Sequence, residues 1–382
     1  MMDNLDEIHD KKFPIDFLES HMTCDIKQLI FMSKSVNHLD PALLLKNGTE
    51  QSAIDDFERF VQSYIELHDK YNFSMIKRID ESPFKVGFLE DIYHFYASTN
   101  AGLIFYATNP ETGENSEMYR FTTSHPIQCV SQNPDNPYLF ALIVHGSITL
   151  LNYSTKISKT INLEKSVIQV SWVTDNYSNS SLVCLNRDLT VGIVDIQNEK
   201  FFTSTTKLES TNESHFLAVH PTRNLAAVCD ERLRIIDFRD SPKIREFALK
   251  EEATSISWLP SENFGCAIGF SDGDIEFFSF ISDSVVMSQN LTNKPLNSIE
   301  FCPSNPSSVS IVVENNIIFA SLPAWGFGNL GRVATYRAHL SPILDAHWTA
   351  NDENASMITC DADHTIHIFD VPDEYMPLYE PE

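Results

Sequence analysis

Hydrophobic and polar residues alternate along this chain in short runs that are separated by polar turns. The runs at 265–270 and 274–280, joined by Ser271-Asp272-Gly273, are typical. A period of two is characteristic of half-buried β-strands, and Asp-Gly between two such runs indicates a tight hairpin turn. The pattern therefore predicts a protein built mainly of short antiparallel strands.

This strand pattern recurs seven times, and each copy can be aligned on an anchor residue at the end of its first long strand. The anchors, most of them aromatic, are Phe88, Gln132, Trp172, Val219, Trp258, Phe301 and Trp348. Successive anchors lie 39 to 47 residues apart, which suits four short strands in each repeat. The repeat predicts an all-β fold, a seven-bladed β-propeller, in which Trp172, Trp258 and Trp348 are structural anchors of their blades.

The two ends of the repeat array predict how the ring closes. A strand-like run precedes every anchor, and the first of these runs, residues 73–79, comes before any complete blade. The last copy, in contrast, ends after its third strand. We expect residues 73–79 to complete the last blade, because a closed ring leaves no long sheet edge exposed.

The last copy carries the clearest local motif. His339 follows a small residue, Thr359 lies in the second strand, Asp363 lies in the tight turn, and Phe369-Asp370 ends the third strand. These residues resemble the motif of the WD40 repeat family, and the resemblance covers residues 73–372. It implies that the side chains at these positions hydrogen-bond together and stiffen the blade. Phe369 stands where the family has Trp, which removes the indole donor and leaves the network incomplete, so the chain resembles a degenerate WD40-like propeller.

Two segments flank this propeller domain. Residues 1–72 are expected to form an acidic, partly helical N-terminal extension, and residues 373–382 an acidic C-terminal tail. Within the extension, residues 52–70 predict a helix, because Ser52 can cap it and apolar residues recur at helical spacing. The stripe contains Ile54, Phe57, Val61, Tyr64 and Ile65. Two interpretations stay open: the stripe packs on the side of the propeller, or Phe57, Val61 and Tyr64 bind a partner.

An earlier part of the extension supports an alternative function. Residues 13–34 resemble the F-box that precedes the propeller of some ubiquitin-ligase subunits. The spacing from Pro14 to Asp25 is shorter than that motif requires, by one helical turn. The alternative interpretation is therefore a substrate receptor of a ubiquitin ligase with a divergent F-box-like N-terminus.

One connection, residues 323–331, is longer than its counterparts and places Trp325 and Phe327 among glycines. Aromatic side chains are the residues that most often anchor protein interfaces. Two roles stay open for this pair: binding a partner, or filling a gap in the side of the propeller.

No motif of an enzyme or a cofactor site stands out. Residues 326–331 match GxGxxG, but that motif holds a nucleotide only where a helix follows, and residues 332–336 have the pattern of a strand. His339, His347, His364 and His367 gather in the last copy, yet strand alternation directs neighbouring side chains to opposite faces. We expect no enzyme activity, no metal, no cofactor and no small-molecule substrate.

The charge and the composition limit the kinds of partner that the protein can bind. The 382 residues include 53 acidic and 27 basic ones, a net charge of −26. This charge repels phosphate, so direct nucleic-acid binding is disfavoured, and the few basic clusters, such as Arg232 with Arg234, are interpreted as solvated charges at strand ends. An odd count of seven cysteines favours a reducing compartment. Without an apolar run that spans a bilayer, we expect a soluble protein of the nucleus or cytoplasm.

These features predict a non-catalytic scaffold, a WD40-like subunit of a stable intracellular multiprotein complex whose partners are other proteins. The degenerate motifs, the acidic surface and the appended arm resemble the small propeller subunits of the outer ring of the nuclear pore. They also resemble the propeller subunits of RNA polymerase III assembly factor complexes. An assembly of the nuclear pore or of the transcription or chromatin type is therefore expected.

Overall fold

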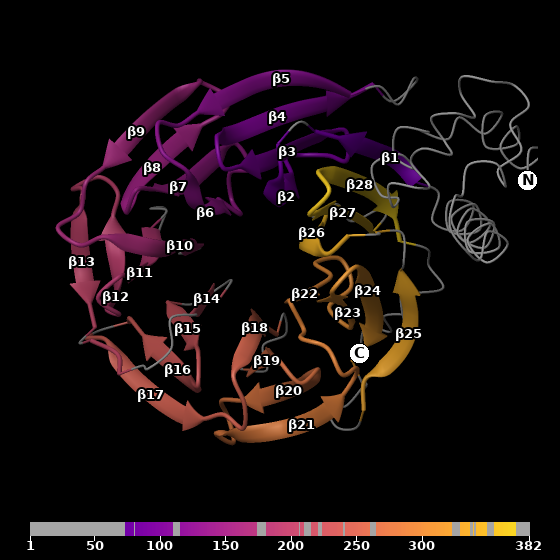
Figure 1. Cartoon of the computed structure of the whole chain (residues 1–382). Coiled ribbons are helices and arrows are strands. Elements are labelled where there is room, and N and C mark those ends of the chain that lie inside the picture. The colour runs from indigo at the N-terminus through magenta and orange to yellow at the C-terminus, as the bar shows by residue number, and fades with distance from the viewer. Residues whose placement is uncertain are drawn as a thin grey trace, which may run out of the picture.

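A computed structural model of the chain shows a ring of seven four-stranded antiparallel sheets around a central channel (Figure 1). The structure describes residues 73–79, 81–109, 115–173, 181–205, 207–209, 215–220, 224–239, 241–259, 265–322, 329–336, 339, 341–349 and 355–371. These residues contain 28 strands. The prediction of an all-β, seven-bladed propeller is confirmed.

The first four blades follow one another along the chain, each with its first strand at the channel. Blade 1 contains β2 (Pro83–Phe88), β3 (His94–Thr99), β4 (Gly102–Thr108) and β5 (Asn115–Thr122). Blade 2 contains β6 (Ile127–Gln132), β7 (Leu139–Val144), β8 (Ser147–Asn152) and β9 (Ile157–Ile161). Blade 3 contains β10 (Val167–Val173), β11 (Ser181–Asn186), β12 (Val191–Asp195) and β13 (Lys200–Ser204). Blade 4 contains β14 (Phe216–Val219), β15 (Leu225–Cys229), β16 (Arg232–Asp237) and β17 (Lys243–Ala248).

The remaining three blades complete the ring (Figure 1). Blade 5 contains β18 (Ala253–Trp258), β19 (Gly265–Phe270), β20 (Asp274–Ser279) and β21 (Ser284–Asn290). Blade 6 contains β22 (Ser298–Phe301), β23 (Ser308–Val313), β24 (Asn316–Ser321) and β25 (Gly331–Tyr336). Blade 7 contains β26 (Ile343–Trp348), β27 (Ser356–Asp361), β28 (Thr365–Asp370) and, at its outer edge, β1 (Phe73–Arg78).

Burial explains the hydrophobic pattern of the sequence. The second strands β19, β23 and β27 are buried at every position, because each is covered by neighbouring blades on both faces. The outer strand β13 alternates between exposed and half-buried residues. Seven hydrophobic clusters fill the seven spaces between adjacent blades. The hydrophobic core is therefore divided into seven parts, one between each pair of adjacent blades.

The hairpin turn predicted at Ser271-Asp272-Gly273 joins β19 to β20. Gly273 has a φ of +85°, in the left-handed region that glycine tolerates best. A Cβ atom at this position would lie 2.2 Å from the carbonyl oxygen of Thr292. Both the backbone conformation and the close approach therefore require glycine here.

Strand β1 closes the ring. It pairs antiparallel with β28, with Ile76 opposite His367 and Arg78 opposite Thr365. The sheet order of blade 7 is β1-β28-β27-β26, so its outer strand comes from the N-terminal side of the array and its other three strands from the C-terminal end. The outer strand of blade 7 is therefore β1, which lies within the segment 73–79 that was expected there.

Several sequence predictions lie outside the described residues. These are the helix at 52–70, the F-box-like segment at 13–34, the aromatic pair Trp325 and Phe327, and the tail at 373–382. The part of the chain that the structure describes contains no helix, so the helical extension stays a prediction. Nor does any described segment form a helix that is long and apolar enough to cross a membrane.

Candidate functional site

Four of the seven anchor residues bind their blade to the one before it. Side-chain N–H groups donate to backbone carbonyls of the preceding blade: Trp172 Nε1 to Ser131 at 2.9 Å, Trp258 Nε1 to Ala218 at 3.1 Å, Trp348 Nε1 to Glu300 at 3.3 Å and Gln132 Nε2 to Phe88 at 2.8 Å. Gln132 interrupts the aromatic series but keeps the N–H donor. The hydrogen bond is thus the property that these four anchors share.

In blade 7, His339 lies at the centre of a buried polar network. Its Nδ1 donates to Asp361 Oδ2 at 2.8 Å, and its Nε2 lies 2.7 Å from Thr359 Oγ1. The sequence analysis assigned the carboxylate of this network to Asp363, and the structure corrects this. Asp361 is fully buried against His339, whereas Asp363 is half-buried in the turn and accepts a hydrogen bond from Ser341.

Phe369, at the position of the tryptophan in the WD40 motif, is part of an aromatic stack. Phe369 is fully buried and stacks on Tyr336, with ring centroids 4.2 Å apart and planes 9° apart. The His367 ring stacks on His339 at 3.9 Å, and Tyr336 Oη lies 3.0 Å from His367 Nδ1. The sequence analysis missed Tyr336 and His367 as members. The sequence could have indicated His367, because it lies two residues before Phe369 and residues two apart in a strand share a face.

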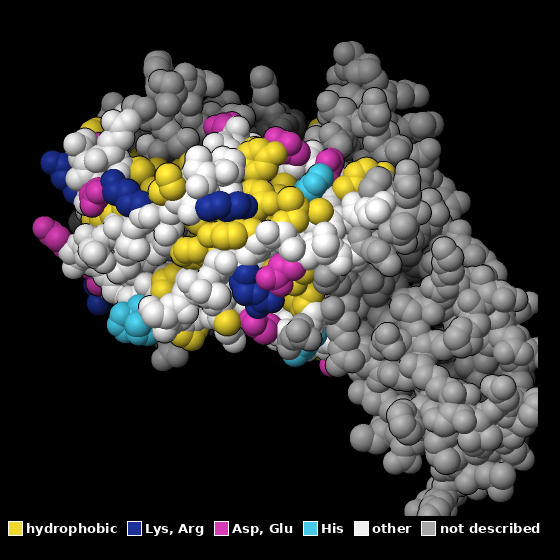
Figure 2. Space-filling view, turned by 90° about the horizontal axis from the view of Figure 1, so that it is seen from above, with side chains coloured by type: hydrophobic (Ala, Val, Ile, Leu, Met, Phe, Trp, Pro, Cys, Tyr) yellow, Lys and Arg dark blue, Asp and Glu magenta, His cyan; other side chains and the backbone are white. Residues whose placement is uncertain are grey.

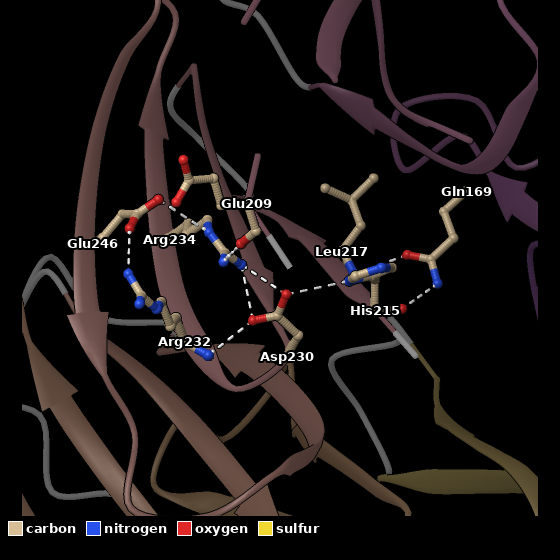
Figure 3. Close-up of polar contacts among 8 residues, drawn as sticks. All are labelled: Gln169, Glu209, His215, Leu217, Asp230, Arg232, Arg234 and Glu246. Atoms are coloured by element: carbon tan, nitrogen blue, oxygen red, sulfur yellow. Dashed lines mark hydrogen bonds and ion pairs between the residues drawn. The ribbon is translucent and has the colours of Figure 1, made fainter. Parts of the chain in front are cut away.

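Blade 4 carries an ion pair at the corresponding place (Figure 3). Arg234 pairs with Val228 in the sheet as His367 pairs with Thr359, and Arg234 Nη1 donates to both carboxylate oxygens of Asp230 at 2.8 Å. Each of these two side chains is only 1% exposed. The interpretation of Arg234 as a solvated charge is therefore wrong, because the adjacent blades bury this strand on both faces.

Glutamine side chains connect blades by a second route. Gln169 of blade 3 accepts from the Leu217 N–H at 2.9 Å and donates to the His215 carbonyl at 2.5 Å in blade 4 (Figure 3). Gln289 of blade 5 contacts the backbone of Leu330 in the same way, accepting from its N–H at 2.7 Å. Each amide reproduces the donor and acceptor of a peptide group, so it extends the backbone hydrogen bonding across a blade boundary.

A charged cluster faces the central channel, which has a volume of about 740 Å³. His347 donates from Nε2 to Asp345 and from Nδ1 to Glu300, both at 3.0 Å. Lys85 Nζ lies 3.5 Å from Asp345, whose Oδ2 also accepts from the Val86 N–H at 2.9 Å. These residues come from β2, β22 and β26, so the cluster joins blades 1, 6 and 7 around the closure of the ring.

The charged groups of this cluster shift one another's pKa values. Burial by itself lowers the pKa of His347, but the carboxylates of Asp345 and Glu300 raise it to about 10. The pKa of Asp345 lies below its usual range, because His347, Lys85 and the Val86 N–H outweigh the effect of burial. At neutral pH His347 is therefore an imidazolium with both N–H groups donating. The two cations and two carboxylates neutralise one another.

Candidate ligands for a metal are dispersed. His347 faces the channel, while His339 and His367 stack inside the blade, so these three of the four histidines of the last copy do not form one group. Among the described residues, no three His, Cys, Asp or Glu side chains are arranged to hold a metal ion.

Exposed apolar side chains lie on the outside of the ring. Phe202 on β13 is 75% exposed, Ile157 on β9 is 65% exposed and Met118 on β5 is 50% exposed. The partner-binding candidates predicted from the sequence, Trp325, Phe327, Phe57, Val61 and Tyr64, all lie outside the described residues. The sequence analysis did not select the outer-strand residues, because a single apolar residue in an alternating strand does not reveal which face is covered.

Comparison with known proteins finds similarity to a nucleoporin over part of the chain. No family model matches it. Over 141 residues the chain is 27% identical to the protein named Nucleoporin Nup37 of Mus musculus. The match covers 36% of this chain and spans 42% of the length of that relative. This seven-bladed propeller is therefore similar, over part of its length, to a nucleoporin.

Proposed function

We propose that this chain is a non-catalytic scaffold subunit of a stable multiprotein assembly of the nuclear pore type. The observation that carries the proposal is the similarity to a nucleoporin, found in a chain that folds as a closed propeller. A closed ring of sheets leaves rims and an outer side on which other proteins can bind. On this account the partners are other subunits of one complex, and the protein resides at the nuclear envelope.

The outer side of the ring has the chemistry of a binding surface. Phe202, Ile157 and Ile281 are each at least 65% exposed, on or beside the outer strands of three different blades. Large apolar side chains held out to solvent by rigid strands suit contacts with other proteins, since their burial is favourable by roughly 1.5 to 3 kcal/mol each. This favours a scaffold with several contacts distributed around it.

The channel supports the non-catalytic part of the proposal. A general base must accept a proton near neutral pH, and His347 is held as an imidazolium there. Its carboxylate neighbours are occupied in ion pairs with it and with Lys85. The charged groups at the channel therefore act on one another and stabilise the ring.

Imaging and purification of the tagged full-length protein test this function. The proposal expects a signal at the nuclear rim and co-purification with nucleoporins at moderate salt. A diffuse signal together with recovery of a ubiquitin-ligase linker protein would instead support the F-box alternative. A protein that purifies alone under these conditions would contradict both.

A further inference from the structure

The boundary between blades 1 and 2 carries a mixed apolar and cationic surface. We define the flank patch as Met118 and Tyr119 of β5, Tyr153 and Lys156 of the turn between β8 and β9, and Ile157, the first residue of β9. Figure 2 looks onto the side of the ring at β5 and shows hydrophobic side chains gathered there, with Lys and Arg side chains among them. The Tyr153 hydroxyl lies 3.5 Å from Met118 Sδ, so the two blades are in direct contact at this patch.

Two tyrosine rings surround the Lys156 ammonium. Its Nζ lies 3.3 Å from the centroid of Tyr153 and 4.2 Å from that of Tyr119, whose planes meet at 49°. Below them Phe105 stacks on Tyr153 at 4.1 Å, which fixes the ring against the core. In the described part of the chain, no carboxylate lies within 4.0 Å of Lys156 Nζ. Burial lowers the pKa of this lysine, as expected for an ammonium that has lost water without gaining an anion.

The equivalent positions of two other blades do have a counter-charge. Lys156, Glu199 and Asp283 each directly precede the outer strand of their blade, with φ values of +59°, +56° and +51°. Glu199 pairs with Lys159 of the preceding outer strand at 2.6 Å, and Asp283 pairs with Arg245 at 2.8 Å. At the boundary of blades 1 and 2 the residue is a cation instead. The equivalent place on the preceding outer strand is Glu117, whose carboxylate pairs with Arg120 at 2.7 Å. Lys156 is therefore left without a counter-charge among the described residues.

We infer that residues 52–70 of this chain dock on the flank patch, with the Glu58 carboxylate paired to Lys156. At helical spacing Glu58 lies beside Ile54, Val61 and Ile65, so a carboxylate borders the apolar stripe predicted from the sequence. The flank patch contains one ammonium among apolar and aromatic residues. The two surfaces are complementary in charge and in polarity, and docking would cover Met118 and Ile157.

The connectivity of the chain favours this occupant over a partner protein. Lys70 is joined to Phe73 by two residues only, and Phe73 begins the outer strand of blade 7, which is next to blade 1 in the ring (Figure 1). A 19-residue helix spans about 28 Å. The segment carries five acidic and two basic residues, a net charge of −3, and is held near the patch at high effective concentration by its tether.

Zero-length coupling of the purified full-length monomer tests the docking. A carbodiimide joins an amine to a carboxylate only when the two are in contact, so the expected product links the Lys156 peptide to the Glu58 peptide within one chain. Glu58→Gln should abolish this product, while Asp56→Asn, on the opposite face at helical spacing, should leave it unchanged. Absence of the product, its restriction to dimers, or coupling of Lys156 only to carboxylates outside residues 52–70 would overturn the inference.

Hydrogen exchange gives a second measurement that does not depend on coupling chemistry. Lys156→Glu should accelerate amide exchange in residues 116–122 and 153–159 several-fold, as should deletion of residues 1–70. The double variant with Glu58→Lys should restore the slow exchange. Lys207→Glu, a charge reversal at an exposed lysine after β13, is the matched control and should change nothing. Equal exchange in the full chain and the 1–70 deletion would also overturn the inference.

Discussion

At the residue scale, the anchors show that the donor group matters as much as the aromatic ring. Gln132 donates through Nε2 to the carbonyls of Phe88 and Pro137, at 2.8 and 2.9 Å. We expect Gln132→Met, which keeps the volume but removes both donors, to lower the free energy of unfolding by about 1 to 3 kcal/mol. Urea unfolding measures this. The control is Gln128→Met on the same strand, where the side chain is exposed; an equal effect of both changes would contradict the role of the hydrogen bonds.

The buried ion pair of blade 4 makes a larger prediction. Asp230→Ala leaves the Arg234 guanidinium buried without its bidentate partner, so we expect a loss of about 3 to 5 kcal/mol in the free energy of unfolding. The exposed pair of Arg232 with Glu246 is the control, because Arg232→Ala should cost at most about 1 kcal/mol. Thermal denaturation of the two variants compares them directly. Similar melting temperatures would show that Glu246, which already accepts from Arg234 Nε at 3.1 Å, is a sufficient partner for the guanidinium.

The channel cluster predicts a defined pH dependence. Because folding raises the pKa of His347 to about 10, its stabilising effect is complete below the unfolded value of about 6.5 and is lost as the pH rises through the folded value. The difference in urea midpoint between the natural protein and His347→Asn should therefore shrink steadily from pH 7 to pH 10. A difference that stays constant over this range would show that His347 is neutral in the folded protein.

At the scale of elements, strand β1 is the closing piece of the ring. Deletion of residues 1–79 removes it and exposes the edge of β28, so we expect cooperative melting to be lost or to occur at a much lower temperature. Deletion of residues 1–72 retains β1 and should still melt cooperatively, at a temperature lowered only by the loss of the docked segment. Circular dichroism on the two truncations makes the comparison. Identical melting of both would contradict closure by β1.

The connection at residues 323–331 makes a prediction about binding. If Trp325 and Phe327 anchor a partner, their joint replacement by alanine should weaken binding of the purified complex by more than about 2 kcal/mol without changing the melting temperature. Asn329→Ala, in the same connection, is the matched control. Unchanged binding by the double variant would assign the aromatic pair to packing against the propeller.

At the scale of the whole molecule, the features that could be predicted are those that depend on local sequence. Strand alternation and the Asp-Gly turn at 272–273 are encoded within one repeat and predict the strands. The spacing of the anchors and the extra strand at 73–79 follow from the order of the repeats along the chain, and they predict seven blades and the closing strand. The burial of Arg234 and the choice of Asp361 over Asp363 depend on the neighbouring blade. The channel cluster joins Lys85 to Asp345 across 260 positions, which no local pattern reveals.

The central claim is that this propeller is a permanent structural subunit, and subunit stoichiometry tests it most directly. Absolute quantification by mass spectrometry of the complex purified through the tagged full-length chain should give a fixed, near-integer ratio to a constant set of nucleoporins, unchanged when the salt concentration is raised. A substoichiometric, variable set of proteins, or one that includes a ubiquitin-ligase linker protein, would contradict the claim.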